Sequence, residues 1–414
     1  MTRIIKSIFT VCICLLLSNI FISCEKHEPK LNNLSIDPNS GIAVADLSGN
    51  YACSIVYGDD LFNAMGIAEG FKRVFRASLP TYHYSEHESQ QEILIGDTSR
   101  NESQQSLSYL SGDGYIIKVL NRKLVIAGTN DSWTAIALHE FQDKVLDNPH
   151  YRINNTLVIP LDFLMKHETK DPQLLAFLLD NGYDFSLIRE HVVTCPSDGT
   201  LNISQGATGD GNSFYFALKN SNDTSTKIFK YDISSLKSIG QTVAFNGGHS
   251  NDLTYNFQSN CLYLAHGKNQ GTTLTIISCD NMEVVKDITI PVGAGAITYN
   301  SSKKMYAVSQ GGTSLHFLDE SFQLLESFTR EPYTGYTAQG MGSDDSYIYF
   351  PMSGTNDNII VVYDWSGEYV TTLTLNTASE SETLFYTNGK YYVSFASVGA
   401  ALFELKPDFY YQYQ

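Results

Sequence analysis

Basic residues, prolines and tryptophans are scarce in this chain of 414 residues. It has 27 Lys and Arg against 44 Asp and Glu, which gives a formal net charge of −17. Because nucleic-acid binding depends on clustered Lys and Arg, this balance argues against a nucleic-acid partner. Only 11 Pro and 30 Gly exclude collagen-like and proline-rich architectures. With 43% hydrophobic and 17% charged residues, the chain has enough apolar material for real cores, and disorder is excluded for most of it.

Several motifs of enzymes and metal sites are also absent. The sequence contains no G-x-S-x-G, P-loop, G-x-G-x-x-G or H-E-x-x-H motif. Its seven cysteines form no C-x-x-C pair and no Cys/His spacing typical of structural zinc. We therefore expect no cofactor and no structural metal. Cys261 and Cys279 lie on adjacent predicted strands, where the sequence is consistent with a disulfide and equally with two free thiols.

The first 23 residues have the composition of an export signal. Arg3 and Lys6 precede an almost wholly apolar run over residues 8–22, which is short for a membrane span and has the length of a signal h-region. The run ends at Phe21-Ile22-Ser23-Cys24, which resembles the lipobox of bacterial lipoproteins. The resemblance implies a lipid such as palmitate on Cys24 and anchoring in the cell envelope at the outer membrane, with the membrane face left open. An ordinary secretory signal is the alternative.

The region after the signal predicts a tether and a small α/β (α+β) domain. Residues 24–48 are polar and indicate a tether, whereas residues 49–165 mix helix and strand patterns. Apolar residues recur at helical spacing over 61–75, and a hairpin is expected to turn at Asn121-Arg122. A second helix is expected to start at Ser132 as its cap.

Three stretches of this domain carry a resemblance to a known accessory domain. They are residues 92–100 (EILIGDTSR), 113–115 (DGY) and 125–135 (VIAGTNDSWTA). The region resembles the small domain that precedes the catalytic barrel in β-hexosaminidases and α-glucuronidases. The resemblance implies a non-catalytic accessory domain. No catalytic barrel follows it in this sequence.

The second half of the sequence repeats itself. Aligned tyrosines follow polar turns at positions 215, 263, 306, 349 and 392, with spacings of 48, 43, 43 and 43 residues. A period near 43 with three to four short strands per unit is typical of a β-propeller blade. A helical repeat is excluded because no unit has 10 residues of helical periodicity. We therefore expect an all-β five-bladed propeller over residues 200–414. Residues 166–199 form a connector, in which 186–194 supplies the outermost strand that the fifth unit lacks and so closes the ring.

The repeats resemble a known family of propeller units. Leu262-Tyr263-Leu264-Ala265, the strand over 273–278 and the segment 284–293 follow the YVTN-type repeats of secreted bacterial and archaeal proteins. The resemblance implies architecture and says little about chemistry. We expect the protein to be a monomer.

Polar residues recur at the start of the first strand of each unit. One position per unit holds Gln205, Asp252, Ala296, Gln339 and Glu382, with His249, Asn251 and Glu380 nearby. We expect a ligand-binding set of Gln205, His249, Asn251, Asp252, Gln339 and Glu382 at the channel mouth. Carboxylates and amides suit sugar hydroxyls or a hydrated cation such as calcium. A channel lined by water-bridged polar side chains is the alternative, and the sequence does not separate the two.

The same residues supply candidates for catalysis. They are His249, with Asp252 as its orienting carboxylate, and Glu380 or Glu382 as an acid. Five-bladed glycosidases resembling arabinanases use inner-strand carboxylates on successive blades, but here Gln205 and Ala296 stand at two of these positions. We therefore favour non-catalytic binding of a glycan or another exported ligand. A propeller glycosidase or polysaccharide lyase and a protein-interaction scaffold are the alternatives.

Overall fold

The computed structural model describes residues 41–58, 61–86, 88–169, 173–267, 271–310, 313–330, 333–397 and 399–409. The chain divides into two compact units, one within residues 1–170 and one within 171–414. The predicted signal, its lipid-bearing Cys24 and most of the predicted tether lie outside the described residues. No helix in the described part of the chain is both long and apolar enough to cross a membrane.

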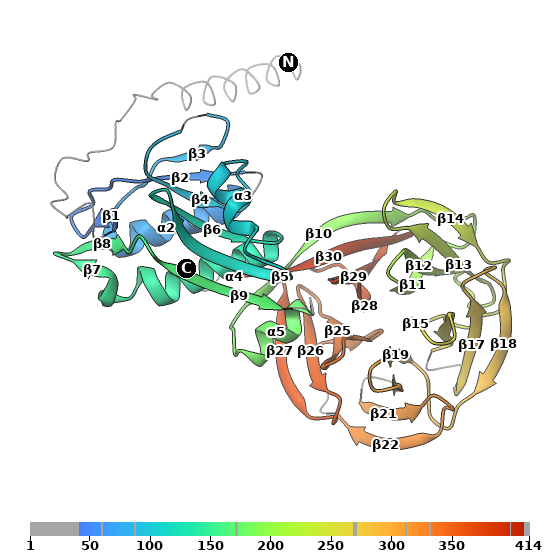
Figure 1. Cartoon of the computed structure of the whole chain (residues 1–414). Helices are drawn as coiled ribbons and strands as arrows, with labels where there is room; N and C mark the ends of the chain where they lie inside the picture. The colour runs from blue at the N-terminus through green and yellow to red at the C-terminus, as the bar shows by residue number, and fades with distance from the viewer. Residues whose placement is uncertain are drawn as a thin grey trace, which may run out of the picture. The chain divides into compact units, whose positions relative to one another are not determined.

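The first unit contains a six-stranded sheet in the order β3-β2-β4-β6-β5-β9 (Figure 1). Its strands are β2 (Ser54–Tyr57), β3 (Thr81–His83), β4 (Glu92–Ile95), β5 (Asp113–Leu120), β6 (Lys123–Gly128) and β9 (Leu164–Thr169). The neighbouring strands β3, β2, β4 and β6 run parallel to one another. The next strand, β5, lies between β6 and β9 and is antiparallel to both. Every residue of β4 and β6 is buried, as expected for strands covered on both faces. A second sheet has the order β1 (Ile42–Asp46), β8 (Thr156–Ile159) and β7 (Arg152–Ile153).

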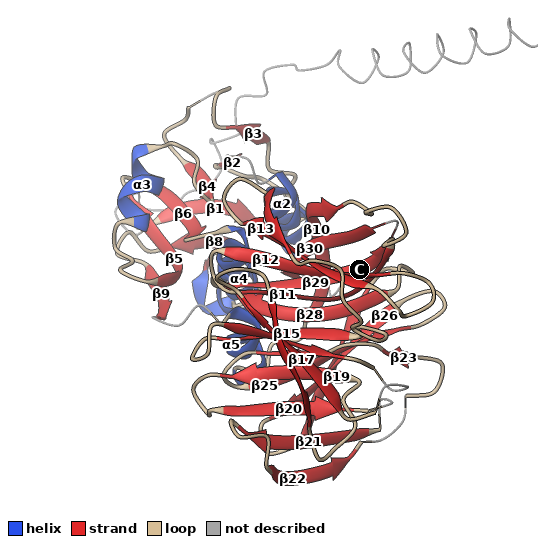
Figure 2. Ribbon diagram, turned by 90° about the vertical axis from the view of Figure 1, so that its right-hand side faces the viewer, coloured by secondary structure: helices blue, strands red, loops and turns tan. Residues whose placement is uncertain are grey.

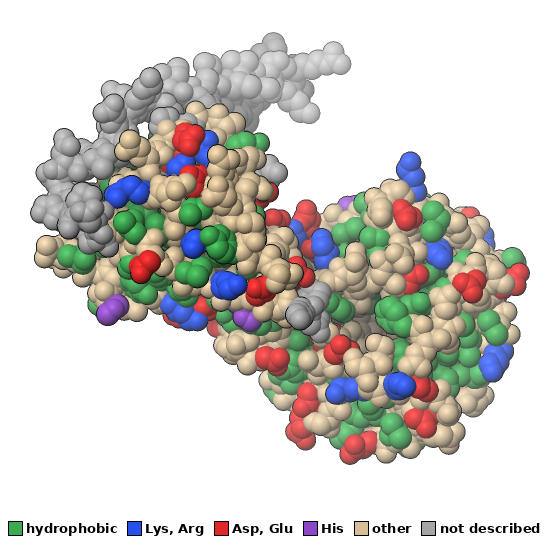
Figure 3. Space-filling view, in the orientation of Figure 1, with side chains coloured by type: hydrophobic (Ala, Val, Ile, Leu, Met, Phe, Trp, Pro, Cys, Tyr) green, Lys and Arg blue, Asp and Glu red, His purple; other side chains and the backbone are tan. Residues whose placement is uncertain are grey.

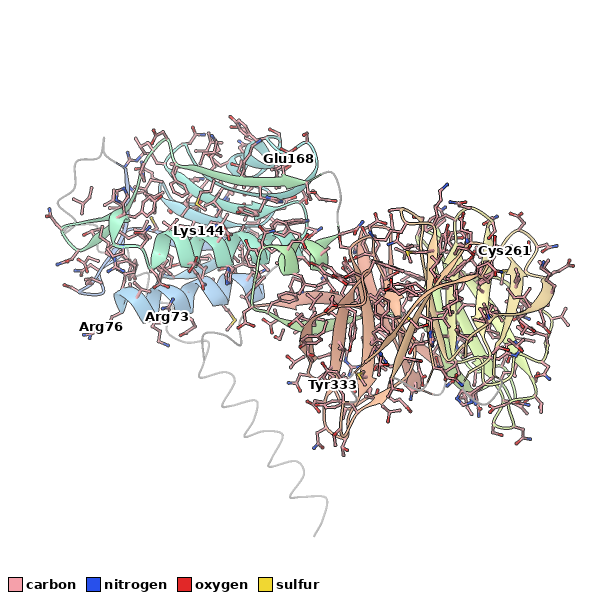
Figure 4. All side chains as sticks on the ribbon, turned by 90° about the horizontal axis from the view of Figure 1, so that it is seen from below. Arg73, Arg76, Lys144, Glu168, Cys261 and Tyr333 are labelled. Carbon is pink, nitrogen blue, oxygen red and sulfur yellow. The ribbon has the colours of Figure 1, made fainter. Side chains whose placement is uncertain are left out.

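The described part of the first unit contains three α-helices. They are α2 (Leu61–Phe75), α3 (Asn101–Leu107) and α4 (Asp131–Phe141), and one π-helical turn, Gln142–Leu146, continues α4. The apolar residues of α2 at helical spacing are buried, whereas Arg73 and Arg76 extend away from the helix (Figure 4). The cap of α4 is Asn130, whose side chain accepts the amide of Trp133 at 3.0 Å, rather than the predicted Ser132. The β5–β6 hairpin turns at Asn121 and Arg122, both with positive φ, as a two-residue turn of this kind requires.

The second unit contains one short helix in its described residues, α5 (Leu174–Asp180), and antiparallel sheets built mainly from consecutive strands. The first sheet contains β11 (Ile203–Gly209), β12 (Ser213–Lys219), β13 (Thr226–Asp232) and β14 (Lys237–Gln241). The second sheet contains β15 (Asp252–Asn256), β16 (Cys261–Ala265), β17 (Thr273–Ser278) and β18 (Val284–Thr289). The third sheet contains β19 (Ala296–Asn300), β20 (Met305–Ser309), β21 (Ser314–Asp319) and β22 (Leu324–Thr329). The next consists of β23 (Thr337–Ala338), β24 (Gly342–Ser343), β25 (Tyr347–Ser353), β26 (Asn358–Asp364) and β27 (Tyr369–Leu375). The last combines β28 (Ser381–Thr387), β29 (Lys390–Ser397), β30 (Gly399–Asp408) and β10 (Ser186–Cys195).

The first strands of these sheets pack against one another in a closed cycle. β11 contacts β15, β15 contacts β19, β19 contacts β24, β24 contacts β28, and β28 contacts β11. Figure 1 shows the sheets arranged radially around the centre of this ring, and Figure 2 shows the same strands from the side. A ring of radially arranged antiparallel sheets is a β-propeller fold.

The strand β10 has the position that the sequence analysis gives to residues 186–194. It pairs with β30 along its length, from Ser186 opposite Asp408 to Cys195 opposite Ala400. A strand that comes before the repeats in the sequence therefore forms the outermost strand of the last sheet. The pairing covers an edge of β30 that would otherwise expose unpaired backbone groups.

Buried tyrosines link neighbouring sheets. The hydroxyl groups of Tyr349 and Tyr391 both donate to Oδ2 of Asp344, at 2.6 and 2.5 Å, while the Asn256 amide donates to Tyr306 at 2.6 Å. Asp344 also accepts the amides of two turn residues, so its carboxylate has four donors. The repeated tyrosines therefore do more than fill the core, because they satisfy polar groups at the ends of the first strands.

All four cysteines in the described residues have free thiols. Cys261 pairs across the hairpin with Ser278, one residue before Cys279, and Figure 4 shows it near the periphery of its unit. Of the two alternatives that the sequence left open for Cys261 and Cys279, the structure has the free thiols.

Candidate functional site

The first strands bring one polar row of residues to the end of the ring at which these strands begin. Tyr263 lies opposite Thr254, nine residues earlier, whereas Tyr306 lies opposite Tyr299 and Tyr349 opposite Gly342, each seven residues earlier. The turns at 257–260 and 301–304 nevertheless both contain four residues, so the difference comes from the position of the tyrosine in its strand and not from the length of the turn. We call the residues near the start of the first strands the mouth row; it consists of Gln205, Asn251, Ala296, Gln339 and Glu382.

Asp252 directly follows Asn251 in the chain and is described separately, because its side chain is engaged by the protein. The residues that follow each member of the mouth row are Gly206, Asp252, Ile297, Gly340 and Thr383. Because successive side chains of a strand point to opposite faces, a shift of one residue changes the surroundings completely.

The Asp252 carboxylate joins the first strands of several sheets. It is fully buried, and Oδ1 accepts the Leu253 amide at 3.0 Å and the Thr383 hydroxyl at 2.8 Å. Oδ2 accepts the amides of Ile297 at 2.9 Å and Met341 at 3.0 Å. Burial raises the pKa of Asp252 to about 7, although the four hydrogen bonds lower it by favouring the ionised form. A carboxylate has about four acceptor positions, so Asp252 retains none for a substrate or a water.

Two glycines allow the strands to approach Asp252 closely. A Cβ atom at Gly206 would lie 2.5 Å from the Leu253 nitrogen, and one at Gly340 would lie 2.7 Å from Oδ1 of Asp252. Both distances are far below a van der Waals contact, so only glycine fits at these positions. The surroundings of Asp252 are therefore tightly packed, and the groups open to a ligand must lie nearer the mouth.

The mouth row is itself cross-linked on one side. The Asn251 side-chain amide donates to the carbonyl oxygens of Gly295 at 2.6 Å and Gln339 at 3.2 Å. The Gln339 side chain donates to Oε1 of Glu380, which is exposed. The predicted residues Asn251, Gln339 and Glu380 are thus brought together, and the exposure of Glu380 shows that this end of the ring is open to solvent.

Glu382 differs from Asp252 in its hydrogen bonding. It is 2% exposed, and its carboxyl group accepts no hydrogen bond from any residue that the structure describes. Burial raises its pKa to about 8, with further increases from Glu380 and Asp252 and an opposing effect from Lys219. Glu382 lies at an irregularity in the pairing of β28 with β29, between Ser381 and Thr383. Such bulges redirect side chains and are frequent beside binding sites.

Gln205 is the second unsatisfied group of the mouth row. It is 5% exposed, and its Nε2 donates to the Ser204 carbonyl at 2.6 Å, but its buried Oε1 has no hydrogen-bond partner among the described residues. It also lies at a pairing irregularity, between Ser204 and Ala207 of β11. Since β11 packs against β28, the two unsatisfied groups lie on neighbouring strands.

His249 pairs with a carboxylate that the sequence analysis did not identify. Its Nδ1 lies 3.0 Å from Oδ2 of Asp223, and Oδ1 of Asp223 accepts a hydrogen bond from Lys219 at 2.6 Å. Partial burial raises the pKa of Asp223, but the bonds from Lys219 and His249 outweigh this and hold it below its usual value. The predicted His249–Asp252 pair is therefore wrong. Asp223 lies in the β12–β13 loop, 26 residues before His249, and nothing local in the sequence connects them.

The arrangement offers hydrogen-bond acceptors rather than an assembled catalytic pair. Asp252 is occupied by protein donors, so it does not combine with Glu382 as base and acid. Within the described ranges, no group of three or more His, Cys, Asp or Glu is placed to hold a metal ion. On the face of this unit seen in Figure 3, acidic and basic side chains are interspersed.

Comparisons with known proteins add similarities of fold. No family model and no curated protein matches the sequence. Glutaminyl cyclase from Myxococcus xanthus is similar over 54% of this chain and 97% of its own, with 13% identity and a TM-score of 0.41. Virginiamycin B lyase from Staphylococcus aureus is similar over 52% of this chain and 69% of its own, with 14% identity and a TM-score of 0.32. A DUF4221 family member from Bacteroides vulgatus is similar over 54% of this chain and 99% of its own, with 9% identity and a TM-score of 0.36. At these values, the similarities carry no argument about function.

Proposed function

We propose that this chain is an exported, lipid-anchored protein of the cell envelope, whose five-bladed β-propeller binds a hydroxyl-bearing ligand such as a glycan without catalysis. The closed cycle of β11, β15, β19, β24 and β28 supports the number of blades. The N-terminal Phe21-Ile22-Ser23-Cys24 supports the lipid anchor and a position at the outer membrane. The first unit is an accessory domain in this proposal, and the protein is a monomer.

The observation that carries the binding proposal is the buried Oε1 of Gln205, which has no partner among the described residues, on a strand next to the one that carries the nearly buried Glu382 carboxyl. A buried polar group without a partner destabilises the folded state by about 1–3 kcal/mol. Such groups are rare in native proteins and call for an explanation. Hydroxyl groups of a sugar would donate to both acceptors from the open end of the ring.

The hydrogen bonds of Asp252 support binding without catalysis. A two-carboxylate hydrolase needs a free base in addition to an acid. The expected base, Asp252, is engaged by donors from three other sheet segments and by its own neighbour Leu253. Glu382 would then act as a binding group alone.

A glycan array followed by titration calorimetry tests the proposal. We expect Gln205→Ala to weaken the binding of any glycan found by at least about 1 kcal/mol, close to fivefold in Kd. Gln241→Ala, an exposed residue at the end of β14, is the matched control and should bind as the wild type does. Equal binding by wild type and Gln205→Ala would contradict the site. Hydrolysis of a bound polysaccharide that is lost in Glu382→Gln would favour the glycosidase alternative.

The lipid anchor is tested separately. Cys24→Ala should abolish metabolic labelling with a fatty-acid analogue and release the protein from the membrane fraction. Labelling that persists in this variant would show that the lipobox interpretation is wrong.

A further inference from the structure

The polar nitrogen atoms around the mouth row each have a partner within the protein. The Asn251 amide donates to the carbonyls of Gly295 and Gln339, and the Gln339 amide donates to Glu380. The Lys219 ammonium donates to Asp223, and the Gln205 amide donates to the Ser204 carbonyl. Among the described residues, Oε1 of Gln205 is buried without a partner, and the nearly buried carboxyl of Glu382 accepts no hydrogen bond. A ligand that completes these two groups must donate hydrogen bonds.

The charges around Glu382 are unbalanced. Glu380, just before β28, and Asp252 on β15 both add negative potential, and Lys219 on β12 acts on Glu382 as a cation. Lys219 is itself paired with Asp223, which also bonds His249. Within the part of the chain that the structure describes, no ion pair joins Glu380, Asp252 or Glu382 to a Lys, Arg or His side chain. Burying an ionised carboxylate is costly unless a cation accompanies it.

We infer that the ligand presents a protonated primary amine to Glu382 and Gln205. This inference rests on the proposed function and names the chemistry of its ligand. An ammonium group carries three donors and a positive charge, so one group donates to the Gln205 oxygen and pairs with the ionised form of Glu382. A hydroxyl group would form the hydrogen bonds and leave Glu382 protonated.

Binding of an ammonium group changes the protonation of Glu382 in a defined way. Burial and the neighbouring carboxyl groups raise the pKa of Glu382 to about 8, so the empty site is mostly protonated at pH 7. The arriving ammonium pairs with the carboxylate form, and the Glu382 proton passes to the solvent. One ligand bound thus releases close to one proton at pH 7, and a neutral ligand releases none.

Calorimetry with two matched pairs of probes tests the inference. Ethanolamine is compared with ethylene glycol, in which a hydroxyl replaces the amine, and glucosamine is compared with N-acetylglucosamine. Titration at pH 7 in two buffers of different ionisation enthalpy measures the protons released. We expect the amine of at least one pair to bind at least tenfold more tightly than its neutral partner, with release of about one proton per site. Preference for glucosamine identifies an amino sugar, and equal binding of both amines identifies a small amine.

Three variants locate the effect. Glu382→Gln should remove both the preference for the amine and the proton release, while Glu326→Gln on the exposed outer strand β22 should keep both. Gln205→Leu should weaken amine binding at least fivefold and leave the proton release unchanged, which keeps the test valid if Glu382→Gln folds poorly. Thermal unfolding of each variant without ligand verifies that it is folded.

The inference is overturned if neither amine binds, if the neutral partners bind as tightly, or if amines bind without proton release. If N-acetylglucosamine or another neutral glycan binds, and Gln205→Ala weakens that binding, the proposed function is supported and only the inference about the amine is overturned. Absence of binding by any glycan or amine would contradict both.

Discussion

Two buried carboxyl groups, Asp252 and Glu382, lie on first strands of the same ring and differ in their hydrogen bonding. Asp252 accepts four hydrogen bonds from the protein, whereas Glu382 accepts none from the part of the chain that the structure describes. Asp344, at the opposite end of the first strands, resembles Asp252 and also has four donors. Burial alone therefore does not distinguish a binding carboxyl group from a structural one in this protein. The number of hydrogen bonds that the carboxyl group accepts from the protein distinguishes them.

The largest effect should come from opening the ring on which both groups depend. Deleting residues 381–414 removes β28, β29 and β30, and leaves β10, β11 and β24 without neighbours. We expect loss of soluble, cooperatively unfolding protein, because the open ring exposes strand edges. Gel filtration and thermal unfolding measure this. A soluble monomer with a single sharp transition would contradict the closed-ring account.

Removing the satisfied carboxylate should cost much stability. Asp252→Ala leaves three buried amides and one hydroxyl group without their acceptor. We expect the free energy of unfolding to fall by at least about 3 kcal/mol in urea titrations. Asp280→Ala, in an exposed hairpin turn, is the control and should lose less than about 1 kcal/mol. A loss below about 1 kcal/mol in Asp252→Ala would show that the carboxylate does not hold the strands together.

A single donor to Asp252 should account for part of this loss. Thr383→Val keeps the shape of the side chain and removes the hydroxyl that lies 2.8 Å from Oδ1. We expect a loss of about 1.5–3 kcal/mol, the range for a hydrogen bond to a charged group. In a double-mutant cycle, Thr383→Val should have little further effect when Asp252 is already Ala. Additive losses would show that the two side chains do not act on each other.

The smallest effect on stability is expected at His249. Its ring is 38% exposed and pairs with a partly exposed Asp223. Such pairs contribute at most about 1 kcal/mol, so His249→Ala should unfold almost as the wild type does. If His249 lines the binding site, ligand affinity should fall by more than the stability does. A large loss of stability with unchanged binding would assign His249 to the structure instead.

The sequence predicted those parts of the molecule that depend on local periodicity. The tyrosines near a 43-residue period, the hairpin at Asn121-Arg122 and the strand over 186–194 all correspond to observed features. Each follows from a pattern of turn residues and alternating apolar residues within one repeat. The turn aspartates at 232, 319 and 364 likewise accept backbone amides of their own turns.

The roles of Asp252 and His249 were not predictable in this way. The partners of Asp252 lie 45, 89 and 131 residues away in the sequence. The pairing of the first strands is also irregular next to Gln205 and Glu382, which the sequence pattern does not show. A polar residue in a first strand looks the same in the sequence whether the ring satisfies it or leaves it for a ligand.

The most direct test of the account compares the pH dependence of unfolding in the wild type and Glu382→Gln. The pKa of Glu382 is about 8 in the folded protein and near 4.3 when unfolded, so between these values the folded state holds a proton that the unfolded state lacks. Wild-type stability should therefore decrease as pH rises from about 5 to about 8, beyond any decrease shared with the variant. Contributions of other groups, including Asp252, largely cancel in the comparison. We predict that the stability of Glu382→Gln relative to wild type increases by at least about 1 kcal/mol over this range, since one pKa unit corresponds to about 1.36 kcal/mol. Parallel stability curves would contradict the account, because they would mean that Glu382 is already satisfied by the protein.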